Sequence, residues 1–101
     1  MILDVVKSKD GVPIRLTFER WEHIVERHSY MSGFLEAILD AVAYPEFILR
    51  GNAGSKIAVA NLSRRRWILV MYRELGKKDG FIISAYIHTD FNENEIIWSR
   101  Q

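Results

Sequence analysis

Cysteine is absent from the chain, which excludes disulfides, thiolate metal sites and thiol nucleophiles. Long apolar runs are absent too, because the longest spans residues 67–72 and is far too short to cross a bilayer. Asp4 interrupts the apolar opening of the chain, where a signal peptide needs continuous apolar residues. We therefore expect a cytoplasmic protein without a membrane segment.

An excess of charge of one sign is also missing. Fourteen basic and thirteen acidic residues leave a formal net charge of +1, so no global field draws the protein onto nucleic acid, and any basic patch must be local. The sequence has no Gly-rich phosphate loop, no Gly-x-Ser-x-Gly elbow and no paired-carboxylate signature. Hydride transfer, nucleotide hydrolysis and serine-triad chemistry therefore lack support, and we expect no cofactor.

The composition that is present is that of a folded domain. Hydrophobic residues make up 49% and charged residues 27% of the chain, close to the average of soluble globular proteins. A chain of 101 residues is too short for two independently stable units. We expect one domain over residues 1–101, with one site or one interface.

The first half of the sequence predicts a hairpin and two helices. Two β-rich runs, residues 2–7 and 12–16, flank an Asp-Gly step, which is a strong hairpin signal. Thr17 can cap a helix over residues 18–28. Apolar residues then recur at spacings of three and four across residues 34–42, which predicts a second amphipathic helix.

The second half has the period of strands. After Pro45, which ends the second helix, four runs are rich in Ile, Val and aromatic residues, at 46–50, 56–62, 66–74 and 80–88. The gaps between them are too short for crossover helices, so successive strands must pair antiparallel. The apolar residues 96–98 of the tail either add an edge strand or dock on the body. The pattern predicts an α+β fold in which the hairpin and helices pack on an antiparallel sheet of four or five strands.

Candidate polar residues begin on the first helix. At about 100° per residue, His28 falls within the apolar arc, whereas His23 lies on the far side, near Arg27. His28 is either a partly buried histidine at a helix C-terminus or a functional imidazole. The histidines are five residues apart and a helical metal pair needs a spacing of four, so we expect no metal site.

The last predicted strand carries a second polar set. Alternation divides residues 80–88 into an apolar face and a face that carries Ile82, Ser84, Tyr86 and His88. This hydroxyl and imidazole row is a candidate binding surface. A sheet with helices on one side and solvent on the other would produce the same pattern without any function.

A basic turn is the third candidate. Arg64, Arg65 and Arg66 lie between two predicted strands, and Arg73 lies near the end of the second strand. Together they could form a local cationic surface despite the near-neutral total charge. A solvated turn without a ligand is the alternative.

Three strings resemble the phage- and toxin-associated branch of the barnase/EndoU/colicin/RelE-like (BECR) nuclease superfamily: Trp21-Glu22-His23-Ile24-Val25-Glu26-Arg27-His28, Pro45-Glu46-Phe47-Ile48 and Ile83-Ser84-Ala85-Tyr86. The resemblance covers the chain from about Thr17 to Asp90. It implies a BECR-like fold of N-terminal helices followed by a four-stranded antiparallel sheet. It also implies a nuclease-like core over residues 13–90, a polar tail over residues 89–101, and the activity of a metal-independent ribonuclease.

Carried over by position, the resemblance implies a catalytic set of His23, Arg27, His28, Ser84 and Tyr86. RNA would be bound by the basic and imidazole residues Arg64, Arg65, Arg66, Arg73 and His88. One departure is clear, since relatives often read His-Pro-Glu after the helix where this chain has His28-Ser29-Tyr30.

The implied chemistry is coherent. Metal-independent RNA cleavage requires a base for the 2′-hydroxyl proton, an acid for the leaving oxygen, and cations for the phosphorane. His23 or His28 would transfer protons, while Arg27 and Arg73 would stabilise charge. Because the two histidines lie about 140° apart on an ideal helix, only one of them can point at the phosphate.

Three functions remain open. The first is a small ribonuclease, the toxin of a toxin/antitoxin or phage-conflict system, for which an antitoxin or immunity protein is the expected partner. The second is a catalytically inactive RNA- or protein-binding module of the same fold. The third is a homodimer in which the tail residues 96–98 complete the sheet of a second subunit.

Overall fold

The structure is a computed structural model that describes residues 1–100. The N-terminal hairpin forms as predicted, with β1 (Ile2–Lys7) and β2 (Pro13–Thr17) paired antiparallel. Gly11 in the turn has a φ of 82°, a conformation that glycine adopts without steric cost.

Both predicted helices are confirmed. α1 (Phe18–Arg27) begins at the expected cap, because the Thr17 Oγ1 accepts a hydrogen bond from the Arg20 N–H at 3.1 Å. A 3₁₀ turn, η1 (Ser29–Gly33), leads into α2 (Leu35–Ala43), which ends before Pro45. Within residues 1–100, no helix combines the length and the apolar character that a membrane span requires.

Five further strands complete the sheet: β3 (Phe47–Arg50), β4 (Lys56–Ser63), β5 (Arg66–Glu74), β6 (Gly80–His88) and β7 (Ile96–Ser99). Two 3₁₀ turns, η2 (Asn52–Gly54) and η3 (Glu93–Glu95), lie between strands. The strand order is β1-β2-β6-β5-β4-β3-β7. The predicted antiparallel pairing of β3 to β6 is confirmed, as is the edge strand in the tail.

The prediction of a purely antiparallel sheet of four or five strands is wrong, both in the number of strands and in their pairing. Seven strands form one mixed sheet, because β2 pairs with β6 in parallel through Arg15 and Phe81. The hairpin therefore continues the sheet beside β6 and covers backbone groups that an edge strand would leave unpaired. The α+β class is confirmed, and the likeness to the BECR fold stays a prediction.

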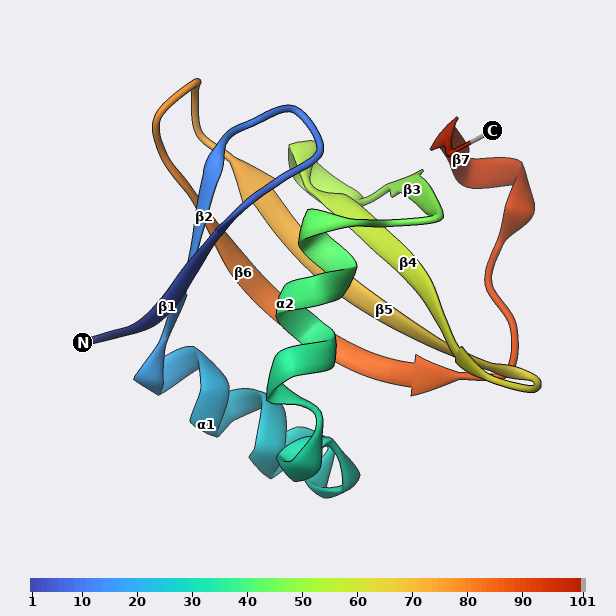
Figure 1. Ribbon diagram of the computed structural model, residues 1–101, viewed down its shortest axis with the longest axis horizontal. Helices are drawn as coiled ribbons and strands as arrows, with labels where there is room; N and C mark the ends of the chain where they lie inside the picture. Colours follow the sequence, from blue (N-terminus) through green and yellow to red (C-terminus); the bar gives the residue numbers. More distant parts are fainter. Residues whose placement is uncertain (101) are drawn as a thin grey trace.

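The main core lies between the helices and one face of the sheet, as Figure 1 shows for α1 and α2. Its fully buried side chains include Ile24 of α1, Ile38 of α2 and Ile82 of β6. A second cluster lies on the opposite face, where Leu49, Val59 and Leu69 are buried and residues of the C-terminal segment pack over them. The outer face of the sheet is therefore not simply exposed to solvent.

An irregularity in β6 changes which residues share a face. Met71 pairs with Ser84, but the next residue of β5, Tyr72, pairs with Ile82, so Ile83 is an extra residue in the ladder. Ile82 consequently joins the helix-side core and Phe81 moves to the outer face. The simple alternation expected across residues 80–88 is wrong for its first half. It holds for Ser84, Tyr86 and His88, which share the outer face.

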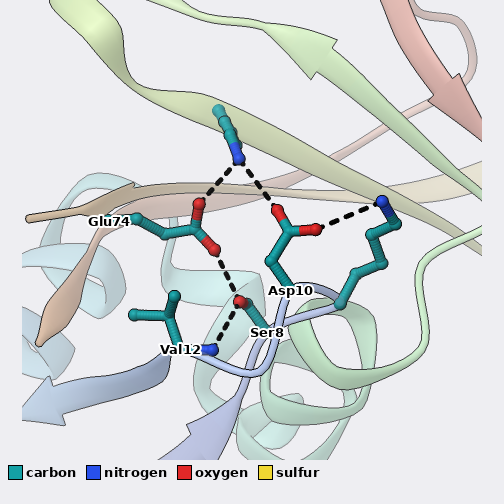
Figure 2. Close-up of polar contacts among 6 residues, drawn as sticks. Ser8, Asp10, Val12 and Glu74 are labelled. Atoms are coloured by element: carbon teal, nitrogen blue, oxygen red, sulfur yellow. Dashed lines mark hydrogen bonds and ion pairs between the residues drawn. The ribbon is translucent and has the colours of Figure 1, made fainter. Parts of the chain in front are cut away.

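A polar network ties the β1–β2 turn to the middle of the sheet. Ser8 Oγ donates to Glu74 Oε2 at 2.6 Å and accepts from the Val12 N–H at 3.2 Å. Lys56 Nζ lies 2.6 Å from Glu74 Oε1 and 3.2 Å from Asp10 Oδ2. Figure 2 shows the Ser8 hydroxyl bonded to Glu74, and the carboxylates of Asp10 and Glu74 bonded to one amine that lies between them. Because these bonds join three elements, the network fixes the turn relative to β4 and β5.

Candidate functional site

The end of α1 meets β6 at a cluster of three ring side chains. His28 is the C-cap residue of α1, and its N–H donates to the Ile24 carbonyl at 2.8 Å. The imidazole centroid lies 6.0 Å from the ring centroid of Tyr86 and 5.7 Å from that of Tyr30. His28, Tyr30 and Tyr86 form the ring cluster. The predicted contact between a helix imidazole and the polar row of β6 is thus present for one histidine.

Tyr30 connects His28 to the edge of β6. Its hydroxyl lies 3.4 Å from His28 Nδ1 and also accepts from the Ile87 N–H at 3.4 Å. A hydroxyl can donate to an unprotonated Nδ1 or accept from a protonated one. Tyr30 can therefore orient the imidazole in either tautomer, which suits a side chain that exchanges protons.

Tyr86 supplies a hydroxyl that stays protonated. Burial of the ring, and to a smaller degree the neighbouring Tyr30, raises the pKa of Tyr86 above its ordinary value. The hydroxyl is therefore a hydrogen-bond donor at neutral pH and not a base. Ser84 lies on the same face, two residues or about 7 Å along the strand. Ser84 therefore offers a second hydroxyl on this face, one step along the strand from Tyr86.

The basic turn lies at the same end of the sheet. Trp67, the residue after Arg66, pairs with His88 at the end of β6. The Arg66 guanidinium lies 5.8 Å from the ring centroid of Phe34, the residue that follows η1 in the chain. Arg64, Arg65 and Arg66 are all exposed. The arginine turn therefore lies beside His88, two residues beyond Tyr86 in β6, and beside Phe34, which follows η1.

Three predicted site residues lie elsewhere. His23 and Arg27 are exposed on α1, and within residues 1–100 neither makes a hydrogen bond, an ion pair or a ring contact with β6. Arg73 shares the outer face but pairs with Phe81. Along β5 it lies four residues from Leu69, the partner of Tyr86, which is about 13 Å. Of the three candidates at α1, only His28 makes a side-chain contact with the polar row of β6.

Tyr30 is the residue that sequence reasoning missed. The sequence drew attention to this position, because His28-Ser29-Tyr30 stands where the resembling nucleases often have His-Pro-Glu. A mismatch with a motif does not show what the replacing residue does.

Within residues 1–100 no three His, Asp or Glu side chains are grouped as metal ligands. No family model matches the chain, and no curated protein and no solved structure gives a significant match to it.

Proposed function

We propose that the protein is a metal-independent endoribonuclease whose reaction takes place at the ring cluster. One observation carries the proposal: the His28 imidazole makes a tilted ring contact with Tyr86 and contacts the Tyr30 hydroxyl, on a strand whose end at His88 lies beside an exposed turn of three arginines. An imidazole, protonated hydroxyls and guanidinium groups are the functional groups that the reaction needs. The resemblance of the α1 and β6 strings to BECR nucleases supports the same reading.

Each residue has a role in this proposal. His28 takes the proton of the 2′-hydroxyl, and Tyr30 holds its Nδ1 so that Nε2 faces the substrate. Tyr86 donates a hydrogen bond to the phosphate, and the 5′-oxygen takes up a proton from water as its bond to phosphorus breaks. The arginine turn binds flanking phosphates, with His88 beside it. His23, Arg27 and Arg73 are not part of this set.

The test is cleavage of labelled RNA by purified protein in excess EDTA. Wild type should cleave, and His28→Ala should lower the rate by about 10²-fold to 10⁴-fold, the usual contribution of a proton-transferring group. His23→Ala removes the same side chain from the far side of α1 and should leave the rate unchanged. Intact RNA after long incubation with a range of sequences would sink the proposal.

The class of system is part of the proposal. A small ribonuclease of this kind would act as the toxin of a toxin/antitoxin or phage-conflict system, neutralised by an antitoxin or immunity protein. Expression in bacteria should then arrest growth with wild type and not with His28→Ala. If RNA is bound but never cut, the outcome favours the catalytically inactive binding module instead.

A further inference from the structure

The outer face of the sheet has a hollow next to the ring cluster. Its volume is about 260 Å³, and Leu49, Ile57 and Leu69 form its floor. The C-terminal segment, residues 89–95, crosses from the end of β6 to β7 beside β3 and supplies the opposite wall. In Figure 1 this segment leaves β6 near the β4–β5 turn.

Two aromatic rings flank the hollow. Tyr86 lines it from β6, and Phe91 lines it from the C-terminal segment. Phe91 is held in place by other rings: its centroid lies 5.1 Å from that of Trp67 and 5.4 Å from that of Phe47. Because these rings already pack against one another, the wall exists before any ligand binds.

Acceptor groups line the rim. Asp90 and Glu95 contribute carboxylates, and Asn92 contributes an amide. Asp90 Oδ1 accepts the Phe91 N–H at 2.8 Å, and Glu95 lies 3.8 Å from the Arg50 guanidinium, a pair that is largely exposed. Carboxylates repel a phosphate but accept hydrogen bonds from ring and exocyclic N–H groups. Arg50 also lines the hollow, but it pairs with Glu95 and faces two carboxylates, so the rim favours a neutral heterocycle over an anion.

We infer that this hollow is a pocket for one nucleobase of a single-stranded RNA, an inference that rests on the proposed function. The volume of the hollow is much larger than that of a water molecule and just below the range of ordinary ligand pockets. The hollow can therefore hold one ring system but not a whole nucleotide. Aromatic rings bind bases by stacking.

Tyr86 links the base pocket to the reaction. The same side chain lines the hollow and lies 6.0 Å, between ring centroids, from His28. A base in the hollow would place its own ribose and phosphate beside Tyr86, within reach of the imidazole. His88, two residues after Tyr86 in β6, also lines the hollow and lies beside the arginine turn. The pocket thus determines which phosphodiester bond reaches His28.

The direct test compares ligands with and without a base. Nucleoside monophosphates and ribose 5-phosphate are titrated into the wild-type protein, and binding is followed by the NMR signals of the Leu49, Ile57 and Leu69 methyl groups. The monophosphates should shift these signals and bind at least about tenfold more tightly than ribose 5-phosphate. Equal affinities, or methyl signals that do not move, would overturn the inference.

A variant isolates the stacking. Phe91→Leu keeps an apolar side chain and removes the ring, so most of the difference between the monophosphates and ribose 5-phosphate should vanish. Phe18→Leu, on exposed α1 surface away from the hollow, is the matched control and should keep it. If Phe91→Leu does not fold, Glu95→Gln serves in its place: an amide oxygen accepts a weaker hydrogen bond than a carboxylate, so the monophosphates should weaken relative to ribose 5-phosphate, and an unchanged ratio would count against the pocket.

Cleavage separates this inference from the proposed function. Homopolymer RNAs cut at equal rates by wild type and by Phe91→Leu would overturn the base pocket and leave the ribonuclease standing. Monophosphates that bind in the hollow of a protein that cuts no RNA would overturn the ribonuclease and leave the pocket standing.

Discussion

The ring planes of His28 and Tyr86 are inclined by 37°, with 6.0 Å between their centroids. One residue ends α1 and the other lies in β6, so only the packing of the helix on the strand brings them together. Ile24, one turn before His28, is completely buried in the main core and fixes that packing. The geometry of the candidate site therefore depends on the same contacts that stabilise the domain.

Tyr30→Phe should slow RNA cleavage by about tenfold or less, because it removes one hydrogen bond to His28 and keeps the ring. Since Tyr30 acts through His28, the pH profile of the rate should shift, and nitrogen NMR should show a changed tautomer population for His28. Tyr44→Phe, at an exposed tyrosine of a pocket away from the ring cluster, is the control. An unchanged rate and tautomer would show that Tyr30 only fills space.

Arg65→Gly should weaken RNA binding without loss of stability. Arg65 has a φ of 61°, a left-handed conformation that costs a side-chain-bearing residue about 1 kcal/mol. Glycine relieves this strain but loses more entropy on folding, so the free energy of unfolding should rise by about 0.5 kcal/mol or stay level. Removing one phosphate contact should reduce the slope of log affinity against log salt by about 0.7.

The control for that change is Lys7→Gly, which removes one positive charge from β1 at the far edge of the sheet. Its salt slope should equal that of wild type. Identical slopes for all three proteins would mean that the arginine turn does not contact RNA.

Asp10→Asn should change stability in a pH-dependent way. Hydrogen bonds from Lys56 and then Lys9 lower the pKa of Asp10 below 3.8, so the folded state binds fewer protons than the unfolded state near that pH. The contribution of Asp10 is present above pH 3.8 and is lost as the pH falls through the lower, folded-state value. The carboxylate is 43% exposed, so solvent screening limits the effect to a fraction of about 1 kcal/mol.

Urea unfolding of wild type and Asp10→Asn measures this difference. It should be present at about pH 7 and should shrink as the pH falls below 3.8 and through the lower, folded-state pKa of Asp10. Asp40→Asn, at an exposed carboxylate with no ion pair in residues 1–100, should differ little from wild type across this range. A difference for Asp10→Asn that persists in acid would refute the assignment to its charge.

Gly80→Ala should destabilise the fold by about 2 kcal/mol or more, the cost of overpacking a closed site. A β-carbon at residue 80 would lie 2.6 Å from the Arg73 carbonyl oxygen and 2.5 Å from the Ile14 Cδ1. Gly33→Ala is the matched substitution, since a β-carbon there has no neighbour within 4 Å. Its effect should stay within about 0.5 kcal/mol. Thermal unfolding of both variants checks the contrast.

The sequence by itself determined the local elements. The Thr17 cap, the Pro45 stop and the change of hydrophobic period are local signals, and the helices and strands begin and end within one or two residues of the predicted positions. The same signals predicted the antiparallel order of β3 to β6, because short gaps leave no other connection.

Tertiary structure decided the rest. The parallel contact of β2 with β6 depends on which sheet edge is free, and the extra Ile83 in β6 depends on the register against β5. Neither the parallel pairing nor the extra residue can be predicted from the sequence of one strand alone. The hydroxyl of Tyr30 reaches His28 and the Ile87 N–H only because η1 folds beside β6. Contacts between distant segments depend on how whole helices and strands pack against one another. A local sequence pattern does not predict that packing.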